Sequence, residues 1–304
     1  MRIVKWIAVL ALIAVAAGWG AGQMIAGRLA AALTEGPARA EAVTASGFPT
    51  RIGVEITGLD VPLEGGRWTA PHLRASAPLW NPLRWTITPA QPQGLILGGL
   101  PLTLSGPAEG QVTVTPGLSV AAAQARLTDP ALALDGAPWI AASDLDATLT
   151  RDDGARYRLA ARLAGLTLPP ETRIDSLTLT GGLEFDHPLA LTAPARLTGL
   201  RIDAGELFSG GRALKVAGAV TVRPDGNLDG TLTFTSRDWL DWLHLAIGGR
   251  LVDPGLEQIL TTMGTLLAQQ SPDGVLALPL VFRDGRMTLG PVPLGPAPRL
   301  DQRQ

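Results

Sequence analysis

The chain contains no cysteine, and lysine occurs only at Lys5 and Lys215. The absence of cysteine excludes disulfide bonds, thiolate nucleophiles and zinc sites built on thiolates. Aromatic residues make up only 5% of the 304 residues, so the core must consist mainly of Leu, Val and Ala. Charged residues make up 17% and the net charge is -2, which gives no basis for binding nucleic acid.

Charge is also missing from one long stretch near the start of the chain. No charged residue lies between Lys5 and Arg28, and the run from Trp6 to Ile25 is almost entirely apolar. A run of about 20 apolar residues can span a bilayer as a helix. With Arg2 and Lys5 ahead of it, the positive-inside rule places the N-terminus in the cytoplasm. The sequence therefore predicts a single-pass anchor over residues 1–33, a stalk over 34–47 and a periplasmic domain held at the inner membrane.

The same stretch is compatible with a cleavable secretory signal. Its most apolar part, from Trp6 to Ala17, has the length of a signal core, and Ala14 to Ala16 has the small-residue pattern of a cleavage site. Apolar, helix-forming sequence continues through Met24 and Leu29, which favours the retained anchor. The alternative is a soluble periplasmic protein, and both interpretations export the rest of the chain.

Beyond Gly47 the pattern of apolar residues changes to a period of two, which indicates half-buried strands. Ile52, Val54 and Ile56 alternate with polar residues or glycine, and the same alternation returns as far as Leu232 and Phe234. Threonine repeatedly occupies the other face, for example at Thr178 and Thr180. Short Gly- and Asp-containing turns separate the strands, so neighbouring strands must be antiparallel.

We therefore predict a mainly β fold with one long, curved antiparallel sheet that forms a groove or a flattened barrel. Residues 48–298 are expected to form a single β-rich domain, followed by a loose tail over 299–304. An apolar sheet face cannot remain in water, so it must curl on itself, take a lid or hold an apolar ligand.

A helical pair is expected over residues 236–270 and packed on the sheet. Thr235 and Asp238 match a capping box, and Trp239, Trp242, Leu243, Ala246 and Ile247 recur at helical spacing. Asp253 and Pro254 match the start of a second helix, with Asp as the N-cap and Pro in the first position. The stripe from Leu256 to Leu267 follows them.

No catalytic, cofactor-binding or metal-binding residues are predicted. His72, His187 and His244 stand apart in the sequence without partners at ligand spacing, and no nucleophile–base set is visible. The acidic residues Asp144, Asp146, Asp152 and Asp153 lie near a turn. A solvated hairpin accounts for them better than a calcium site, because no complete ligand loop is present.

Tryptophans form the one concentration of unusual residues. Trp68, Trp80 and Trp85 are interleaved with proline and arginine, which is compatible with an aromatic rim for a ligand or a membrane interface. The alternative is an irregular crossing whose indole rings fill corners over the sheet. With the helical Trp239 and Trp242, these five residues form the candidate surface for an apolar ligand or a lid.

Several short motifs resemble a known family. Gly47-Phe48-Pro49, Trp68-Thr69-Ala70-Pro71, Asn81-Pro82 and the run from Leu289 to Pro296 are similar to the motifs of domain of unknown function 2125, an envelope family typical of alphaproteobacteria. No catalytic residues are established for that family. The segment from Leu200 to Phe234 is similar to repeats of AsmA-like proteins, and this second likeness implies a curved sheet that accommodates lipid.

The leading hypothesis is a non-enzymatic, membrane-anchored envelope protein whose sheet binds a lipid or another apolar ligand and needs no cofactor. The alternative is a structural or interaction protein of the envelope with a closed core and no ligand.

Overall fold

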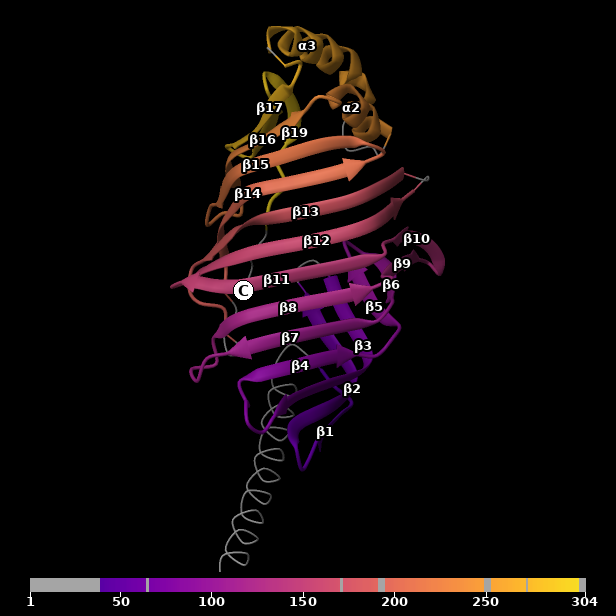
Figure 1. Cartoon of the computed structure of the whole chain (residues 1–304), viewed down its shortest axis with the longest axis vertical. Coiled ribbons are helices and arrows are strands. Elements are labelled where there is room, and N and C mark those ends of the chain that lie inside the picture. The colour runs from indigo at the N-terminus through magenta and orange to yellow at the C-terminus, as the bar shows by residue number, and fades with distance from the viewer. Residues whose placement is uncertain are drawn as a thin grey trace, which may run out of the picture. The chain divides into compact units, whose positions relative to one another are not determined.

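The computed structural model describes residues 39–63, 66–169, 172–190, 195–248, 253–271 and 273–300. The predicted anchor and the first part of the predicted stalk lie outside these ranges. No helix in the described part is long and apolar enough to cross a membrane. Although the sequence predicts one domain over 48–298, the chain divides into two compact units at Trp139 and Ile140. Each unit is mainly antiparallel β-sheet, as predicted (Figure 1).

The first unit contains nine complete strands among its described residues. They are β1 (Ala42–Ser46), β2 (Arg51–Leu63), β3 (Gly66–Pro78), β4 (Arg84–Pro89), β5 (Gln93–Leu97), β6 (Leu100–Ser105), β7 (Ala108–Val114), β8 (Val120–Thr128) and β9 (Ala131–Leu134). Strand β10 (Ala137–Ala141) crosses the boundary between the units. Residues 42–46 were predicted to belong to the stalk, but they pair along β2 as β1. Because Ala42, Thr44 and Ser46 alternate with Val43 and Ala45, the segment suits a strand as well as a stalk.

The sheet of the first unit forks at β3. The C-terminal half of β3 pairs with β4, whereas its N-terminal residues 66–69 pair with β5. One branch continues from β4 to β7 and β8, and the other continues from β5 to β6 and β9. A short connection between β4 and β5 links the two branches. It is fixed by a hydrogen bond in which the Ala90 amide donates to the His72 carbonyl over 2.7 Å. The region from Trp68 to Trp85 is therefore mostly strand, not the irregular crossing considered from the sequence.

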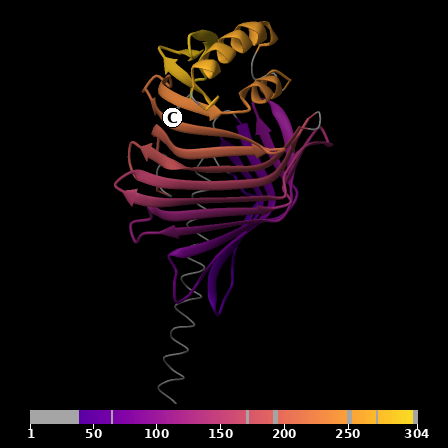
Figure 2. The same cartoon turned by 45° about the horizontal axis from the view of Figure 1, so that its top comes forward.

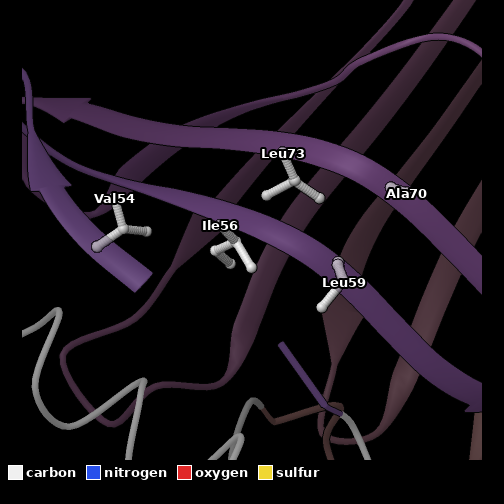
Figure 3. Close-up of a cluster of buried hydrophobic side chains, with 5 residues drawn as sticks. All are labelled: Val54, Ile56, Leu59, Ala70 and Leu73. Carbon is white, nitrogen blue, oxygen red and sulfur yellow. The ribbon is translucent and has the colours of Figure 1, made fainter. Parts of the chain in front are cut away.

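Gly58 of β2 lies beside the buried core cluster of the first unit. Its φ of +61° lies in the left-handed region, which glycine adopts without the steric cost of a Cβ atom. β2 keeps one register with β3 past Gly58. Ile56 and Leu59, on either side of Gly58, belong to one buried cluster (Figure 3). The other buried members are Val54, Ala70 and Leu73.

The second unit is a meander in which each described strand pairs with the next. Its strands are β11 (Asp144–Asp153), β12 (Arg156–Leu168), β13 (Thr172–Phe185), β14 (Leu197–Ser209), β15 (Arg212–Val222), β16 (Leu228–Ser236), β17 (Leu276–Arg283), β18 (Arg286–Leu289) and β19 (Val292–Pro296). All neighbouring pairs are antiparallel. The hydrophobic alternation therefore placed β11, β12, β13, β15 and β16 correctly, whereas no strand was predicted over β14 or over β19, which lies in a Pro-rich run.

Two helices stand between β16 and β17, as predicted: α2 (Trp239–Gly248) and α3 (Glu257–Gln270). Asp253 is the predicted N-cap, and its carboxylate accepts the Gly255 amide over 2.7 Å. It caps a short 3-10 turn, η1 (Pro254–Leu256), that leads into α3. The capping box predicted at Thr235 and Asp238 is wrong, because the Asp238 amide donates to the hydroxyl of Ser236 over 3.0 Å.

The start of the predicted loose tail is bound to the second unit. The Leu300 amide donates to the Gly226 carbonyl over 3.0 Å, and the Arg299 guanidinium donates to the Asn227 side chain over 3.0 Å. Both partners lie in the turn between β15 and β16. Two hydrogen bonds to one turn fix residues 299 and 300, so the prediction of a tail beginning at 299 is wrong for these two residues.

Candidate functional site

The three tryptophans of the first unit have different environments. Trp68 on β3 is half-buried, and its indole N–H donates to the Gln93 side-chain oxygen over 2.8 Å. Trp85 is half-buried on β4, whereas Trp80 lies in the turn between β3 and β4 and is 80% exposed. Trp68 also packs against the core cluster of Figure 3. Trp68 therefore has a packing role, and Trp80 has the exposure expected of a rim residue.

The two helical tryptophans are placed differently in the helical pair. Trp242 is the buried residue of α2, at 8% exposure. The ring of Trp239 lies against Gly264 of α3, where an added Cβ would come within 2.6 Å of the indole. α3 also contacts β17. The pair lies at an end of the sheet of the second unit, and not across the middle of that sheet (Figure 2).

The second unit has a continuous apolar face at the middle of its strands. Directly paired residues in antiparallel strands place their side chains on the same face. The registers therefore join Leu149 to Leu159, and they run through Ile202 and Leu232 to Leu280. A second row of paired residues lies beside the first and runs from Ala147 to Leu278. We call these two rows the central apolar face; its apolar side chains are Leu149, Leu159, Ile202, Leu232, Leu280, Ala147, Ala161, Leu179, Val216, Phe234 and Leu278.

All the apolar side chains of this central face are half-buried, and none is fully buried. Glycines interrupt both rows, with Gly181 and Gly218 in one row and Gly205 in the other. Neighbouring atoms fill the space at these glycines, since an added Cβ would lie 2.0 Å from the Arg201 carbonyl oxygen at Gly181, 2.2 Å from the Thr231 carbonyl oxygen at Gly218 and 2.5 Å from the Val216 side chain at Gly205. The face is therefore apolar and partly open to solvent.

One end of this face is closed. Tyr157, Val220 and Phe282 lie in the adjoining row of the sheet and are at most 6% exposed. The ring of Phe185 meets Tyr157 edge to face at 5.7 Å, and the Tyr157 hydroxyl accepts the Leu189 amide over 2.9 Å. The segment that follows β13 is thus tied to the ring of Tyr157. Sequence reasoning missed this role, although Tyr157 is the one tyrosine of the chain.

A carboxylate fixes the base of that closing segment. The Arg196 amide donates to the Asp186 carboxylate over 2.9 Å, and the Asp186 amide donates to the Arg196 carbonyl over 3.0 Å. The hydrogen bond from the Arg196 amide lowers the pKa of Asp186 below its ordinary value. Asp186 therefore stays ionised at neutral pH and holds the two ends of the connection between β13 and β14 together.

The opposite face of the same strands is polar and carries a shallow depression of about 310 Å³ over Gly182 and Gly199. Three arginines border it, and each is paired with a carboxylate at 2.8 to 3.7 Å: Arg158 with Asp152, Arg201 with Asp203 and Arg156 with Glu184. All six side chains are largely exposed. Since the charges are balanced and solvated, the depression has no excess charge with which to select an anion.

The histidines do not meet one another. Each lies beside a single carboxylate: His72 near Glu55, His187 near Asp186 and His244 near Glu257. Among the residues that the structure describes, no three His, Asp or Glu side chains are grouped closely enough to hold a metal ion.

The fold defines a mainly antiparallel β protein with a helical pair near its C-terminus. A protein-family model matches residues 15–298, and the chain belongs to that family, domain of unknown function 2125, described as an uncharacterized protein conserved in bacteria. The resemblance found in the sequence motifs is thereby confirmed, whereas the likeness to AsmA-like proteins stays a prediction. No curated protein and no solved structure matches the chain.

Proposed function

We propose that the second unit binds an apolar ligand, such as the acyl chain of a lipid, against its central apolar face. The observation that carries this proposal is the row of half-buried aliphatic side chains from Leu149 to Leu280, which is interrupted at Gly181 and Gly218. Fully burying one such side chain is favourable by about 1.5–3 kcal/mol. An acyl chain laid across the face would gain part of that energy at each strand it crosses.

The face crosses the strands from β11 to β17, and this length supports a chain-like ligand in preference to a compact one. A flexible hydrocarbon can follow such a row, and each CH₂ group removed from water contributes about 0.8 kcal/mol. The row of Tyr157, Val220 and Phe282 runs beside the face and would border the ligand along one side. On this proposal the protein carries or holds its ligand and performs no chemistry on it.

The proposal is tested with a photoactivatable fatty acid added to membranes that contain the full chain. Leu179→Gln should lower crosslinking at least about fivefold, because covering a polar amide with hydrocarbon costs at least about 1 kcal/mol. Thr178→Gln is the matched control, since the neighbouring Thr178 is exposed on the opposite face and its replacement should leave crosslinking unchanged.

The mapped crosslinks decide between the two function classes. Labelled peptides from β12 to β16 that include apolar-face residues support the lipid proposal. Equal, weak labelling of the parent, Leu179→Gln and Thr178→Gln proteins would contradict it and favour a structural or interaction protein without a ligand.

We further propose that the protein is anchored in the inner membrane by the apolar stretch from Trp6 to Ile25, with both units in the periplasm. The basis is the absence of charge between Lys5 and Arg28. Mass spectrometry of the mature protein should then recover a peptide that begins at Met1 or next to it. A mature N-terminus near Ala17 would contradict the anchor and leave a soluble periplasmic protein.

A further inference from the structure

The tip of the hairpin formed by β5 and β6 is apolar and fully presented to solvent. All six residues from Ile96 to Pro101 are exposed, and none carries a charge or a polar side chain. Ile96, Leu97 and Leu100 are 40%, 42% and 50% exposed. The turn itself is Gly98-Gly99, both with positive φ, and no other atom lies within 4 Å of the position of either Cβ.

Aliphatic groups lie on both faces of this tip. Leu97 pairs with Leu100 on one face, and Ile96 pairs with Pro101 on the other. A protein partner that docks on one face of a hairpin would leave the other face in water. A tip that is apolar on both faces matches a medium that surrounds it, as the hydrocarbon at a membrane surface does.

Four other hairpin tips in the described chain show the usual chemistry of a solvated turn. Exposed aspartates occupy the tips at Asp135, Asp153, Asp225 and Asp284. Such residues favour turns and keep them in water. The tip between β5 and β6 uses two glycines for the same geometry and surrounds them with leucine, isoleucine and proline. Turn formation alone does not require this choice.

We propose that the hairpin tip Ile96–Pro101 inserts into the surface of a lipid bilayer. Arg67 of β3 pairs opposite Ile96, is largely exposed and is bound to Asp60 at 3.2 Å. Arginine keeps its charged end in the polar headgroup layer while its stem lies along apolar surface, so Arg67 marks the depth at which insertion stops. This contact is separate from ligand binding by the second unit and does not depend on it.

The absence of cysteine from the chain allows a site-specific test. The full chain with Leu97→Cys, labelled with an environment-sensitive fluorophore, is reconstituted into vesicles of phosphatidylethanolamine and phosphatidylglycerol with brominated acyl chains. The brominated lipid should quench the label at position 97, and aqueous iodide should not. The control is Ser105→Cys, exposed at the other end of β6 and roughly 17 Å away along the strand; its label should be quenched by iodide.

A second substitution in the labelled chain tests whether the apolar side chains of the tip cause its insertion. Ile96→Asp should lower partitioning of the tip about tenfold or more, because it removes one aliphatic group from hydrocarbon. Thr103→Asp, exposed on β6, the other strand of the same hairpin, should not change it. Iodide quenching at position 97 equal to that at position 105 would overturn the proposal. A label at position 97 that is shielded from both quenchers would also overturn it and would indicate a protein contact.

Discussion

Replacing Tyr157 with alanine is expected to lower the free energy of unfolding of the second unit by about 3–5 kcal/mol, the range for deleting a large buried aromatic ring. Tyr157 is 1% exposed and is among the largest fully buried side chains of the described chain. Its ring packs edge to face with Phe185, an arrangement that adds about 0.5–1.5 kcal/mol beyond the buried area. Alanine would leave a cavity where β12, β13 and the segment after β13 meet.

Urea unfolding followed by tryptophan fluorescence measures this loss, and Tyr157→Phe is the matched control. Phenylalanine keeps the ring and removes only the hydroxyl that accepts the Leu189 amide, which should cost about 1 kcal/mol. Equal losses from the two substitutions would show that the ring contributes nothing beyond its hydrogen bond. The closing segment would then not depend on Tyr157 packing.

Alternation in the sequence predicted the strands of the second unit because it reports the two faces of each strand directly. Leu177 and Leu179 were expected on the face opposite Thr178 and Thr180, and the registers of β13 with both of its neighbours agree. Short turns between consecutive strands then imply a meander. In such a fold, local sequence determines both the elements and their pairing.

The strand pairing of the first unit could not be predicted from local sequence. The period of two shows that β3 is a strand, but it does not indicate that the two ends of β3 pair with different partners. The same limit applies to β1, whose residues 42–46 pair with β2 instead of extending the stalk. Strand pairing depends on partners distant in the chain, and alternation alone does not identify them.

The candidate site could also be predicted only in part from the sequence. The sequence located the apolar face, because its leucines repeat at every second position. It gave all five tryptophans one shared role, whereas the structure gives Trp68 and Trp239 packing contacts and leaves Trp80 exposed. The closed end at Tyr157 depends on Phe185 at the end of β13 and on Leu189 beyond it, two contacts with residues distant in the sequence that alternation does not identify.

Replacing Gly218 with alanine is expected to destabilise the second unit by more than about 3 kcal/mol. Gly218 lies in the central apolar face, between Ile202 of β14 and Leu232 of β16. Its φ is +144°, a conformation that strains any residue with a side chain. An added Cβ would lie 2.2 Å from the Thr231 carbonyl oxygen and 2.9 Å from the Leu232 Cα, both backbone atoms. Relief would require β15 and β16 to separate, which breaks their hydrogen bonds.

Gly211→Ala separates the two contributions to this effect. Gly211 lies in the turn between β14 and β15 with a φ of +86°, but no other atom is within 4 Å of its Cβ position. Alanine there should cost only the backbone strain, about 1–2 kcal/mol. The difference between the two variants in urea unfolding therefore measures the contact with the Thr231 carbonyl. If Gly218→Ala lowers the free energy of unfolding no more than Gly211→Ala does, β15 and β16 can separate locally without destabilising the second unit. The close approach of the two strands would then not stabilise the sheet beneath the apolar face.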